Sequence, residues 1–258
     1  MRPNQVKQTV KTGSVSIGTM VCEFNTNGIA LIAATAGADF VMFDMEHTGW
    51  SVETISRVIA AGRGADIVPL VRVPMAEYHF IARVLDAGAM GLMVPMVESE
   101  EQARLIVRCA KYPPQGRRGA AFGLTHDAYT QGNVIEKMMT ANYEQLLIAQ
   151  IETVQGLDNA DRIAAVEGID VLWIGHFDLS NSLGIPGQFD HPKFQIAIDH
   201  VVEVCRRYGK APGYMASSVE EGRQLKARGF RCFAYGGDLW IYQQALRKGL
   251  ADIRTSNP

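Results

Sequence analysis

Short apolar runs alternate with helix-like segments along the whole chain. Several runs are apolar at every position, as in Phe40–Phe43 and Leu146–Ala149. Strands that are buried on both faces have this pattern, and parallel sheets are built from such strands. The pattern predicts eight strands, at Val15–Cys22, Asp39–Asp44, Ile67–Val73, Gly91–Met96, Leu146–Ile151, Val171–Gly175, Ala211–Met215 and Arg231–Tyr235.

The segments between the strands have helical periodicity. Helices are expected at Val52–Arg63, Ala76–Ala87, Glu98–Cys109, Asn159–Val166, Ile196–Tyr208 and Val219–Ala227. A glycine, which is the usual residue after a helix C-terminus, stands shortly before a strand at Gly37, Gly88, Gly168, Gly209 and Gly229. Alternating β/α units of this number predict a closed (β/α)8 barrel. An open doubly wound sheet is the main alternative, but no G-x-G-x-x-G follows the first strand.

The chain has 258 residues without a Pro- or Gly-rich linker, so we predict one domain over residues 1–258. Residues 1–12 are expected to form a short amphipathic helix that caps one end of the barrel. Residues 111–145 form a long connection, and long connections in compact domains are usually functional or disordered. We expect this segment to lie where a substrate loop lies, with four polar residues on it: Arg117, Arg118, His126 and Asp127.

Composition narrows the class of protein without naming a function. The net charge of -2 argues against a nucleic-acid partner, which requires a basic face. No run of ~20 apolar residues predicts a membrane span, and the polar N-terminus lacks the apolar core of a signal peptide. The cysteines form no C-x-x-C pair, which excludes a zinc ribbon and a disulfide framework. We therefore expect a cytoplasmic protein without nucleic-acid or membrane partners.

Candidate chemistry gathers at the C-terminal ends of the predicted strands, where barrels of this kind have their active sites. Glu152 and Asp178 directly follow two neighbouring strands, and such carboxylates suit Mg²⁺ or Mn²⁺ with water and substrate oxygens as further ligands. The alternative is that each acid caps the following helix. No lysine stands at a strand end, so carbonyl chemistry here requires a metal rather than a Schiff base.

A cation and a histidine join these acids. Arg72 closes an apolar strand and needs an anion, either the carboxylate of an α-keto acid or a structural partner such as Asp44 or Glu46. His47 is a candidate general base, because the pKa of histidine lies near neutrality; the alternative is a hydrogen bond to backbone. Asp86 is a candidate for orienting His47 across the barrel, or is simply a polar residue near a helix C-terminus.

The chain resembles the HpcH/HpaI class II pyruvate aldolases, which include 2-keto-3-deoxy sugar acid and 4-hydroxy-2-oxo-acid aldolases. The resemblance covers nearly the whole chain in order, and it rests on the segments FDMEHTGWSVETI, VRVP, LDAGAMGLMVPMVES, KYPPQGRRG, QIET, GIDVLWIGHFDLSNSLGIPGQFDHP and KAPG. It implies a barrel of the phosphoenolpyruvate/pyruvate superfamily that cleaves a 4-hydroxy-2-keto acid reversibly to pyruvate and an aldehyde through a metal-stabilised enolate.

The resemblance also implies roles for single residues. Glu152 and Asp178 would hold Mg²⁺ or Mn²⁺, with Co²⁺ as an alternative. Arg72 would bind pyruvate and stabilise the enolate, and His47, paired with Asp86, would act as acid and base. The other substrate-binding residues would be Asp44, Gly175, His176 and Phe177. The family exchanges its last helices, here Leu239–Leu250, between the subunits of a hexamer that is a trimer of dimers.

Two departures from the family pattern concern specificity. His176 stands where the family commonly has the proline of G-P-x-D, and the GAAFGLTHDAY loop replaces an A-R-A segment. We expect His176 to tune the metal site or contact substrate, and His126 and Asp127 to affect which aldehyde is accepted. Two other functions stay open: a citramalyl-CoA-like lyase, which would need a basic cluster for CoA, and a non-catalytic barrel.

Overall fold

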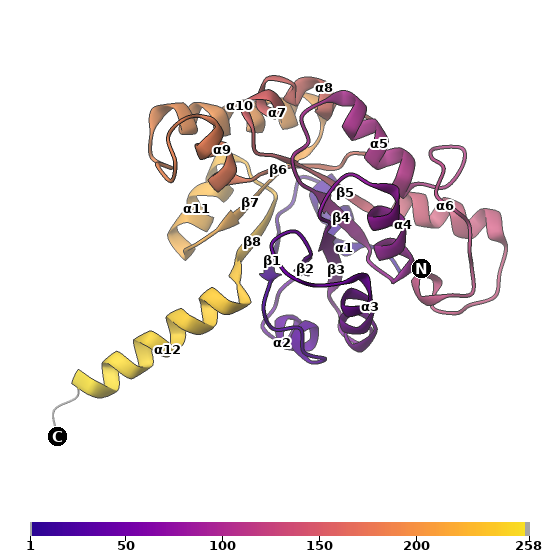
Figure 1. Cartoon of the computed structure of the whole chain (residues 1–258), viewed down its shortest axis with the longest axis horizontal. Coiled ribbons are helices and arrows are strands. Elements are labelled where there is room, and N and C mark those ends of the chain that lie inside the picture. Colours follow the sequence, from indigo (N-terminus) through magenta and orange to yellow (C-terminus); the bar gives the residue numbers. More distant parts are fainter. Residues whose placement is uncertain (1, 256–258) are drawn as a thin grey trace.

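Eight parallel strands close into a barrel in which each strand pairs with the next and β8 returns to β1 (Figure 1). The structure is a computed structural model that describes residues 2–255. The predicted (β/α)8 barrel is confirmed. The strands are β1 (Ser16–Val21), β2 (Phe40–Asp44), β3 (Val68–Arg72), β4 (Gly91–Val94), β5 (Leu146–Ile151), β6 (Val171–Ile174), β7 (Ala211–Ala216) and β8 (Cys232–Gly237).

Helices surround the barrel. They are α1 (Gln5–Lys11), α2 (Ile29–Thr35), α3 (Val52–Ala61), α4 (Tyr78–Asp86), α5 (Glu100–Ala110), α6 (Val134–Glu144), α7 (Val154–Asp158), α8 (Ala160–Ala164), α9 (His176–Ser182), α10 (Pro192–Tyr208), α11 (Val219–Arg228) and α12 (Asp238–Thr255), with the short 3-10 helix η1 (Thr125–Asp127). The helix predicted at Asn159–Val166 begins earlier and is divided, because Asn159 ends α7 and begins α8.

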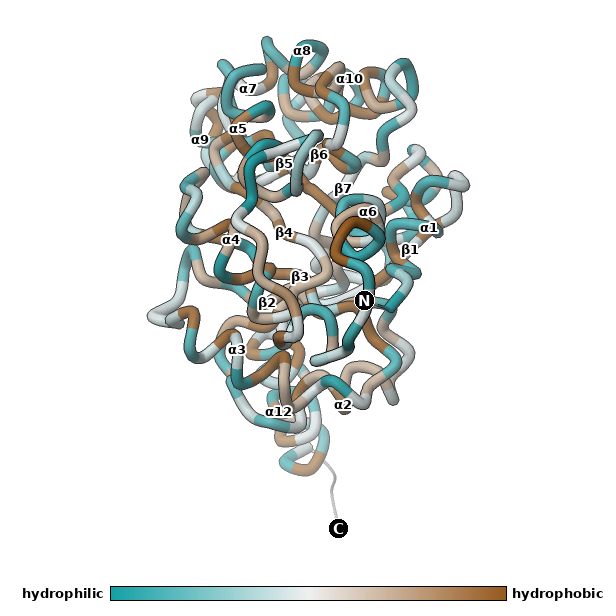
Figure 2. Tube along the Cα trace, turned by 90° about the vertical axis from the view of Figure 1, so that its right-hand side faces the viewer, coloured by the Kyte–Doolittle hydropathy of each residue, from teal (hydrophilic) through white to brown (hydrophobic). Residues whose placement is uncertain are grey.

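Alternation along each strand creates two apolar layers. On β2, Phe40 and Met42 pack inside the barrel with residues such as Leu70. Val41 and Phe43 point outward and pack in the larger layer under the helices. The apolar stretches of the strands accordingly lie within the ring of helices (Figure 2). Both faces of the strands are buried, which explains their uninterrupted apolar sequence.

The N-terminal end of the barrel is closed by α1. Val6 and Val10 join the interior apolar layer. Asn4, which is fully buried, caps the helix at the Lys7 amide and donates from Nδ2 to the carbonyl oxygens of Met90 and Glu144, at 2.8 and 2.9 Å. This end is therefore filled by protein, and the open end is the one at the C-termini of the strands.

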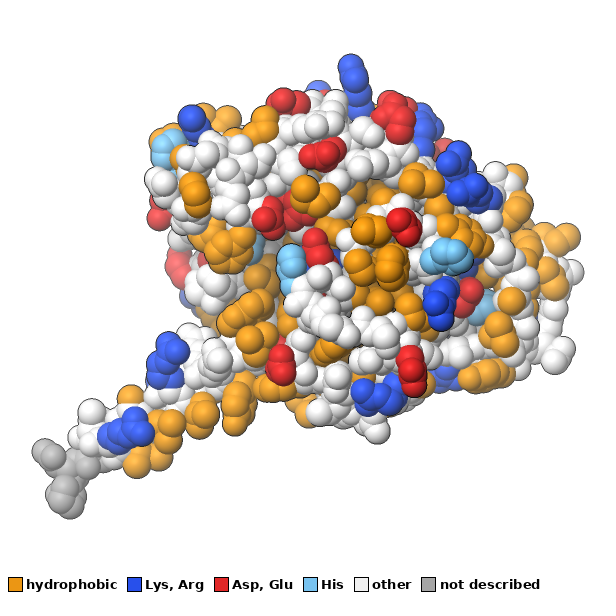
Figure 3. Space-filling view, in the orientation of Figure 1, with side chains coloured by type: hydrophobic (Ala, Val, Ile, Leu, Met, Phe, Trp, Pro, Cys, Tyr) orange, Lys and Arg blue, Asp and Glu red, His pale blue; other side chains and the backbone are white. Residues whose placement is uncertain are grey.

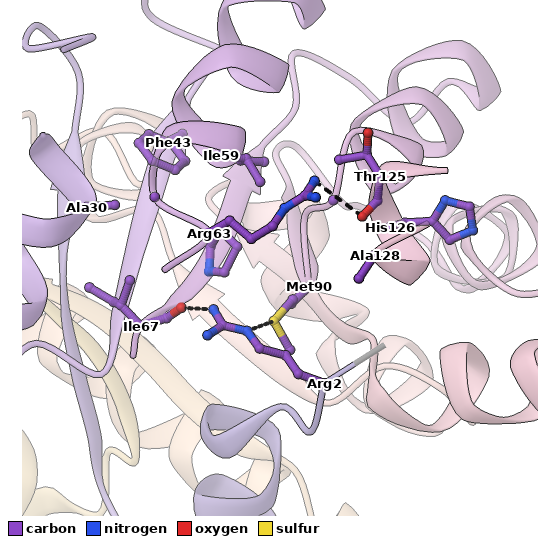
Figure 4. A pocket seen from close by; sticks show the side chains of 13 residues that line it. Arg2, Ala30, Phe43, Ile59, Arg63, Ile67, Met90, Thr125, His126 and Ala128 are labelled. Carbon is purple, nitrogen blue, oxygen red and sulfur yellow. Dashed lines mark hydrogen bonds between the residues drawn. The ribbon is translucent and has the colours of Figure 1, made fainter. Parts of the chain in front are cut away.

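Residues 111–145 leave α5 at the closed end and run along α4, where Gly119 reaches the Tyr78 hydroxyl, so within one chain they do not line the mouth cavity as a substrate loop would. The segment follows α5 and leads into the start of β5, which places it opposite the ends of the strands. A small cavity here is lined by Arg2, Arg63, Thr125 and His126 (Figure 4). Arg2 donates to the Ile67 carbonyl oxygen, just before β3 begins. His126 and Asp127 therefore do not line the cavity at the mouth of their own barrel, and the prediction that they affect which aldehyde is accepted stays a prediction.

The last helix, α12, extends away from the barrel (Figure 1). Its start is fixed by Asp238, whose carboxylate accepts hydrogen bonds from the backbone N–H groups of Cys22, Glu23 and Phe24 at 2.7–3.0 Å. Beyond this anchor, a row of apolar side chains lies exposed along one side of the helix (Figure 3), including Tyr242, Leu246 and Ile253. None of the helices in residues 2–255 combines the length and apolar character that crossing a membrane requires.

Candidate active site

A cavity of about 700 Å³ opens at the C-terminal ends of the strands. It is lined by predicted site residues from β2, β3 and α9 and from the loops that follow β2, β5 and β6. They are Asp44, His47, Arg72, Glu152, Gly175, His176, Phe177 and Asp178. The structure thus brings together eight of the nine predicted site residues. Asp86 is the exception.

Arg72 is held by two acids at once. Its Nε and Nη2 donate to the two carboxylate oxygens of Asp44, both at 2.8 Å. Its Nη1 lies 3.0 Å from Oε2 of Glu46. The bidentate pair follows from the strand register, in which Asp44 and Arg72 are direct neighbours on β2 and β3. The ion-pair alternative for Arg72 is therefore present in the structure, with both acids as partners, while the guanidinium still lines the cavity.

Glu152 is a buried carboxylate that faces the cavity. Its Oε1 accepts from the Met96 backbone N–H at 2.6 Å, and its Oε2 accepts from the Gln150 amide. A Cβ at position 175 would overlap the Glu152 side chain, so Gly175 leaves the space that this carboxylate occupies. The capping alternative for Glu152 is wrong, because Thr153 caps α7.

Asp178 lies in the first turn of α9, beside the end of β6. No side chain caps this helix, so the capping alternative for Asp178 is also wrong. Burial is the largest cause of the raised pKa of Glu152, and the negative charge of nearby Asp178 raises this pKa further. Two carboxylates that follow neighbouring strands therefore line the same cavity and interact electrostatically.

The site carries more negative than positive charge. Four carboxylates, those of Asp44, Glu46, Glu152 and Asp178, share the single guanidinium of Arg72. Burial raises the pKa of Glu46 to about 7, against the lowering effect of Arg72, and the other three acids raise it further. Such crowding of carboxylates is costly in the absence of a cation.

These residues fit a hard divalent cation. Oxygen ligands and an excess of negative charge are what Mg²⁺ and Mn²⁺ require, and these ions usually keep water or substrate in several positions. Within residues 2–255, no three His, Cys, Asp or Glu side chains form a more complete metal site. A cation at Glu152 and Asp178 would therefore take its remaining ligands from water and small molecules.

His47 and Asp86 are not brought together within one chain. His47 lies at the cavity mouth, where its side chain is 62% exposed. The distance from its Nε2 to Oε2 of Glu46 is 3.7 Å. Asp86 ends α4, at the closed end of the barrel, where its Oδ1 accepts from the buried Arg118 at 2.5 Å. The topology separates them because the end of a helix and the end of a strand lie at opposite ends of a β/α unit.

The comparisons with known proteins agree with this geometry. Residues 21–245 match the family of HpcH/HpaI aldolase/citrate lyase proteins. The chain belongs to this family. It is 34% identical over 250 residues to 5-keto-4-deoxy-D-glucarate aldolase of Escherichia coli K12, covering 97% of this chain and 96% of the relative. It is 36% identical over 252 residues to 2-keto-3-deoxy-L-rhamnonate aldolase of Escherichia coli O9:H4, covering 98% and 94%.

A solved structure gives the same result for the fold. The HpcH/HpaI aldolase from Desulfitobacterium hafniense DCB-2 superposes with a TM-score of 0.92 at 33% identity, and the match covers 98% of each chain. The family assignment made from the sequence motifs is therefore confirmed.

Other residues of this HpcH/HpaI site were missed by sequence reasoning. Gln150 orients Glu152 and lines the cavity, and its Oε1 is buried without a hydrogen-bond partner among residues 2–255. Its position two residues before Glu152 on one strand predicts the same face, which was a usable signal. Trp240 reaches the cavity from the start of α12, and no local pattern indicated this contact.

Proposed function

We propose that this chain is a divalent-metal-dependent aldolase that reversibly cleaves a 4-hydroxy-2-keto acid to pyruvate and an aldehyde. The observation that carries the proposal is the meeting of Glu152 and Asp178 in a cavity with a carboxylate-bound arginine. The aldolases among the relatives, which match nearly the whole chain, support a carbon–carbon lyase. A cytoplasmic location stays a prediction from the sequence.

In this proposal Glu152 and Asp178 hold the cation, Mg²⁺, Mn²⁺ or Co²⁺. When bound, the cation polarises the keto oxygen of the substrate and stabilises the enolate. Arg72, oriented by Asp44, adds positive charge beside the enolate oxygen. The Gly175 N–H donates to the Ile151 carbonyl oxygen. The N–H groups of His176 and Phe177, at the start of α9, are therefore the ones that would bind the substrate carboxylate.

His47 moves the proton in this proposal. Its exposed ring at the cavity mouth accepts the proton of the C4 hydroxyl through water as the C3–C4 bond breaks. Because Asp86 lies at the other end of its own barrel, it can assist His47 only in a second copy of the chain. The exposed apolar side of α12 supports such an assembly, and we extend the proposal to the exchange of this helix between subunits of a hexamer.

The two alternative functions lack support at the site. A lyase acting on CoA thioesters needs cations for the phosphates, but Arg72 is the only lysine or arginine among the described residues that line the cavity. A non-catalytic barrel has no need of four carboxylates around one arginine, an arrangement that costs stability. We therefore favour the aldolase.

The test combines metal binding with pyruvate release. The purified chain, treated with EDTA and dialysed, is assayed with 2-keto-3-deoxy sugar acids before and after addition of Mn²⁺ or Mg²⁺. We expect no pyruvate without metal and recovery of activity upon metal addition. Full activity after chelation, or trapping of a substrate adduct by borohydride, would contradict the proposal.

A further inference from the structure

The cavity has a charged half and an apolar half. The acids and Arg72 stand at the ends of β2, β3 and β5 and at the start of α9. The other half is formed by residues of β1, β6 and β7, by Phe177 on the first turn of α9 and by Trp240 at the start of α12. Its wall consists mainly of aromatic and thioether side chains: Met20, Trp173, Phe177, Met215 and Trp240. On the proposed function, on which this inference rests, pyruvate takes the charged half and the aldehyde takes the apolar half.

As formed by the described residues of one chain, the apolar half has no cation for an anionic aldehyde. Arg72 is the only lysine or arginine among the described residues of the cavity wall, and all three of its guanidinium nitrogens face Asp44 or Glu46. The one charged residue of the apolar half is Glu23, which repels anions. A carboxylate on the aldehyde would therefore lose its hydration without gaining a partner.

His176 is the polar group of this wall. Its ring stacks on Tyr214 with centroids 5.0 Å apart and an interplanar angle of 25°, and Phe177 and Phe189 pack around it at 4.6 and 5.2 Å. No hydrogen bond to a described residue uses its ring nitrogens, although the residue lines the cavity. Because packing already restricts the His176 side chain, its ring can offer one hydrogen-bond donor and one acceptor to a ligand with little further loss of side-chain entropy.

We propose that the aldehyde half of the site selects an uncharged, hydroxylated aldehyde, and that His176 is a specificity-determining residue that hydrogen-bonds the hydroxyl group. The aromatic wall packs against the carbon chain of the aldehyde. The new carbon–carbon bond still forms between C3 of pyruvate and the aldehyde carbon, whose oxygen takes up a proton.

The first experiment measures aldehyde preference in the metal-loaded protein. With Mn²⁺ and pyruvate, kcat/KM is determined for two matched pairs: lactaldehyde against propanal, and butanal against succinate semialdehyde. Lactaldehyde should exceed propanal roughly fivefold, as expected for one neutral hydrogen bond. Butanal should exceed succinate semialdehyde roughly tenfold or more, because of the unpaired carboxylate. A preference for succinate semialdehyde would overturn the inference.

The second experiment tests His176 itself. His176→Phe keeps an aromatic ring at this place in the wall but removes its nitrogens. The ratio of kcat/KM for lactaldehyde to that for propanal should therefore fall to within about twofold of unity. The ratio for butanal to succinate semialdehyde should stay as in the wild type. His176→Gln retains a donor and an acceptor and should keep part of the lactaldehyde preference. His79→Phe, at an exposed position on α4, is the matched control. An unchanged lactaldehyde preference in His176→Phe would overturn the role of His176.

Exchange of the pyruvate C3 protons for deuterium separates this inference from the proposed function. The exchange reports enolate formation and needs no aldehyde, so it is measured on the metal-loaded wild type with pyruvate alone. If the metal-loaded wild type shows no exchange, the proposed function fails and the inference falls with it. If exchange is normal but the aldehyde preferences differ from those expected, only the inference fails.

Glu23→Lys should raise the rate with succinate semialdehyde, relative to the rate with butanal, at least about threefold.

Discussion

Both ends of the barrel hold charged side chains, but they balance those charges differently. At the closed end, cations are held by acids, as in Lys7–Asp170 at 2.9 Å and Lys137–Asp127 at 2.7 Å, or by backbone carbonyl oxygens, as is the buried Lys111. At the mouth, four carboxylates share Arg72. The closed end is therefore electrostatically complete without any ligand, whereas the mouth retains negative charge that a cation would neutralise. The difference indicates that one end provides stability and the other sacrifices stability for binding.

The largest expected effect follows from removing charge at the mouth. Glu152→Gln keeps the shape of the side chain but removes a metal-ligating charge. We expect loss of metal binding by calorimetry and a fall in kcat/KM of about a thousandfold or more. The metal-free variant should unfold at the same temperature as the wild type or higher, because a crowded carboxylate is gone.

The control for this comparison is Glu77→Gln, which makes the same change at an exposed position before α4. Metal binding and activity should both survive there. Activity lost in Glu152→Gln with metal affinity unchanged would show that Glu152 is not a ligand.

The opposite pattern is expected at the closed end. Asn4→Ala removes the cap of α1 and leaves the buried carbonyl oxygens of Met90 and Glu144 without this donor. The free energy of unfolding should fall by about 2–3 kcal/mol, measured by denaturant titration. The folded fraction should keep the wild-type kcat, since the cavity is at the other end.

The control is Gln5→Ala, an exposed position on the same helix, which should change the unfolding free energy by less than about 0.5 kcal/mol. An equal effect of both substitutions would mean that α1 does not close the barrel through Asn4.

The sequence predicted the strands better than the positions of the loops. The strands were recognisable because burial on both faces leaves continuous apolar runs. Glycine at 37, 88, 168, 209 and 229 correctly indicated helix ends, and each has a positive φ that favours glycine. These signals are local, so no knowledge of the packing was needed to interpret them.

Asp86 and residues 111–145 lie away from the cavity of their own barrel for a topological reason. Both stand after a helix and before a strand, and this order places them at the N-terminal end of the barrel. Their residue types invited a functional interpretation that their positions exclude within one chain. The partners of Arg72 were unresolved for a different reason. Choosing between Asp44 and Glu46 required the register of β2 against β3 and the path of the loop after β2, and apolar runs do not determine either.

The smallest of the three effects concerns Glu46 and its dependence on pH. Its folded-state pKa of about 7 lies above the ordinary 4.5, because burial disfavours the charge. The folded metal-free chain therefore binds this proton more tightly than the unfolded chain, so ionised Glu46 destabilises the fold above pH 7. This cost disappears as the pH falls from 7 towards 4.5.

Glu46→Gln should abolish that part of the pH dependence and raise the unfolding free energy at pH 8 by on the order of 2 kcal/mol, less the lost contact with Arg72. Thermal unfolding in EDTA at pH 5, 6, 7 and 8 measures the difference. If the variant and the wild type follow parallel curves over this range, the excess charge at the mouth does not include Glu46, and the contrast between the two ends of the barrel rests on the remaining three acids.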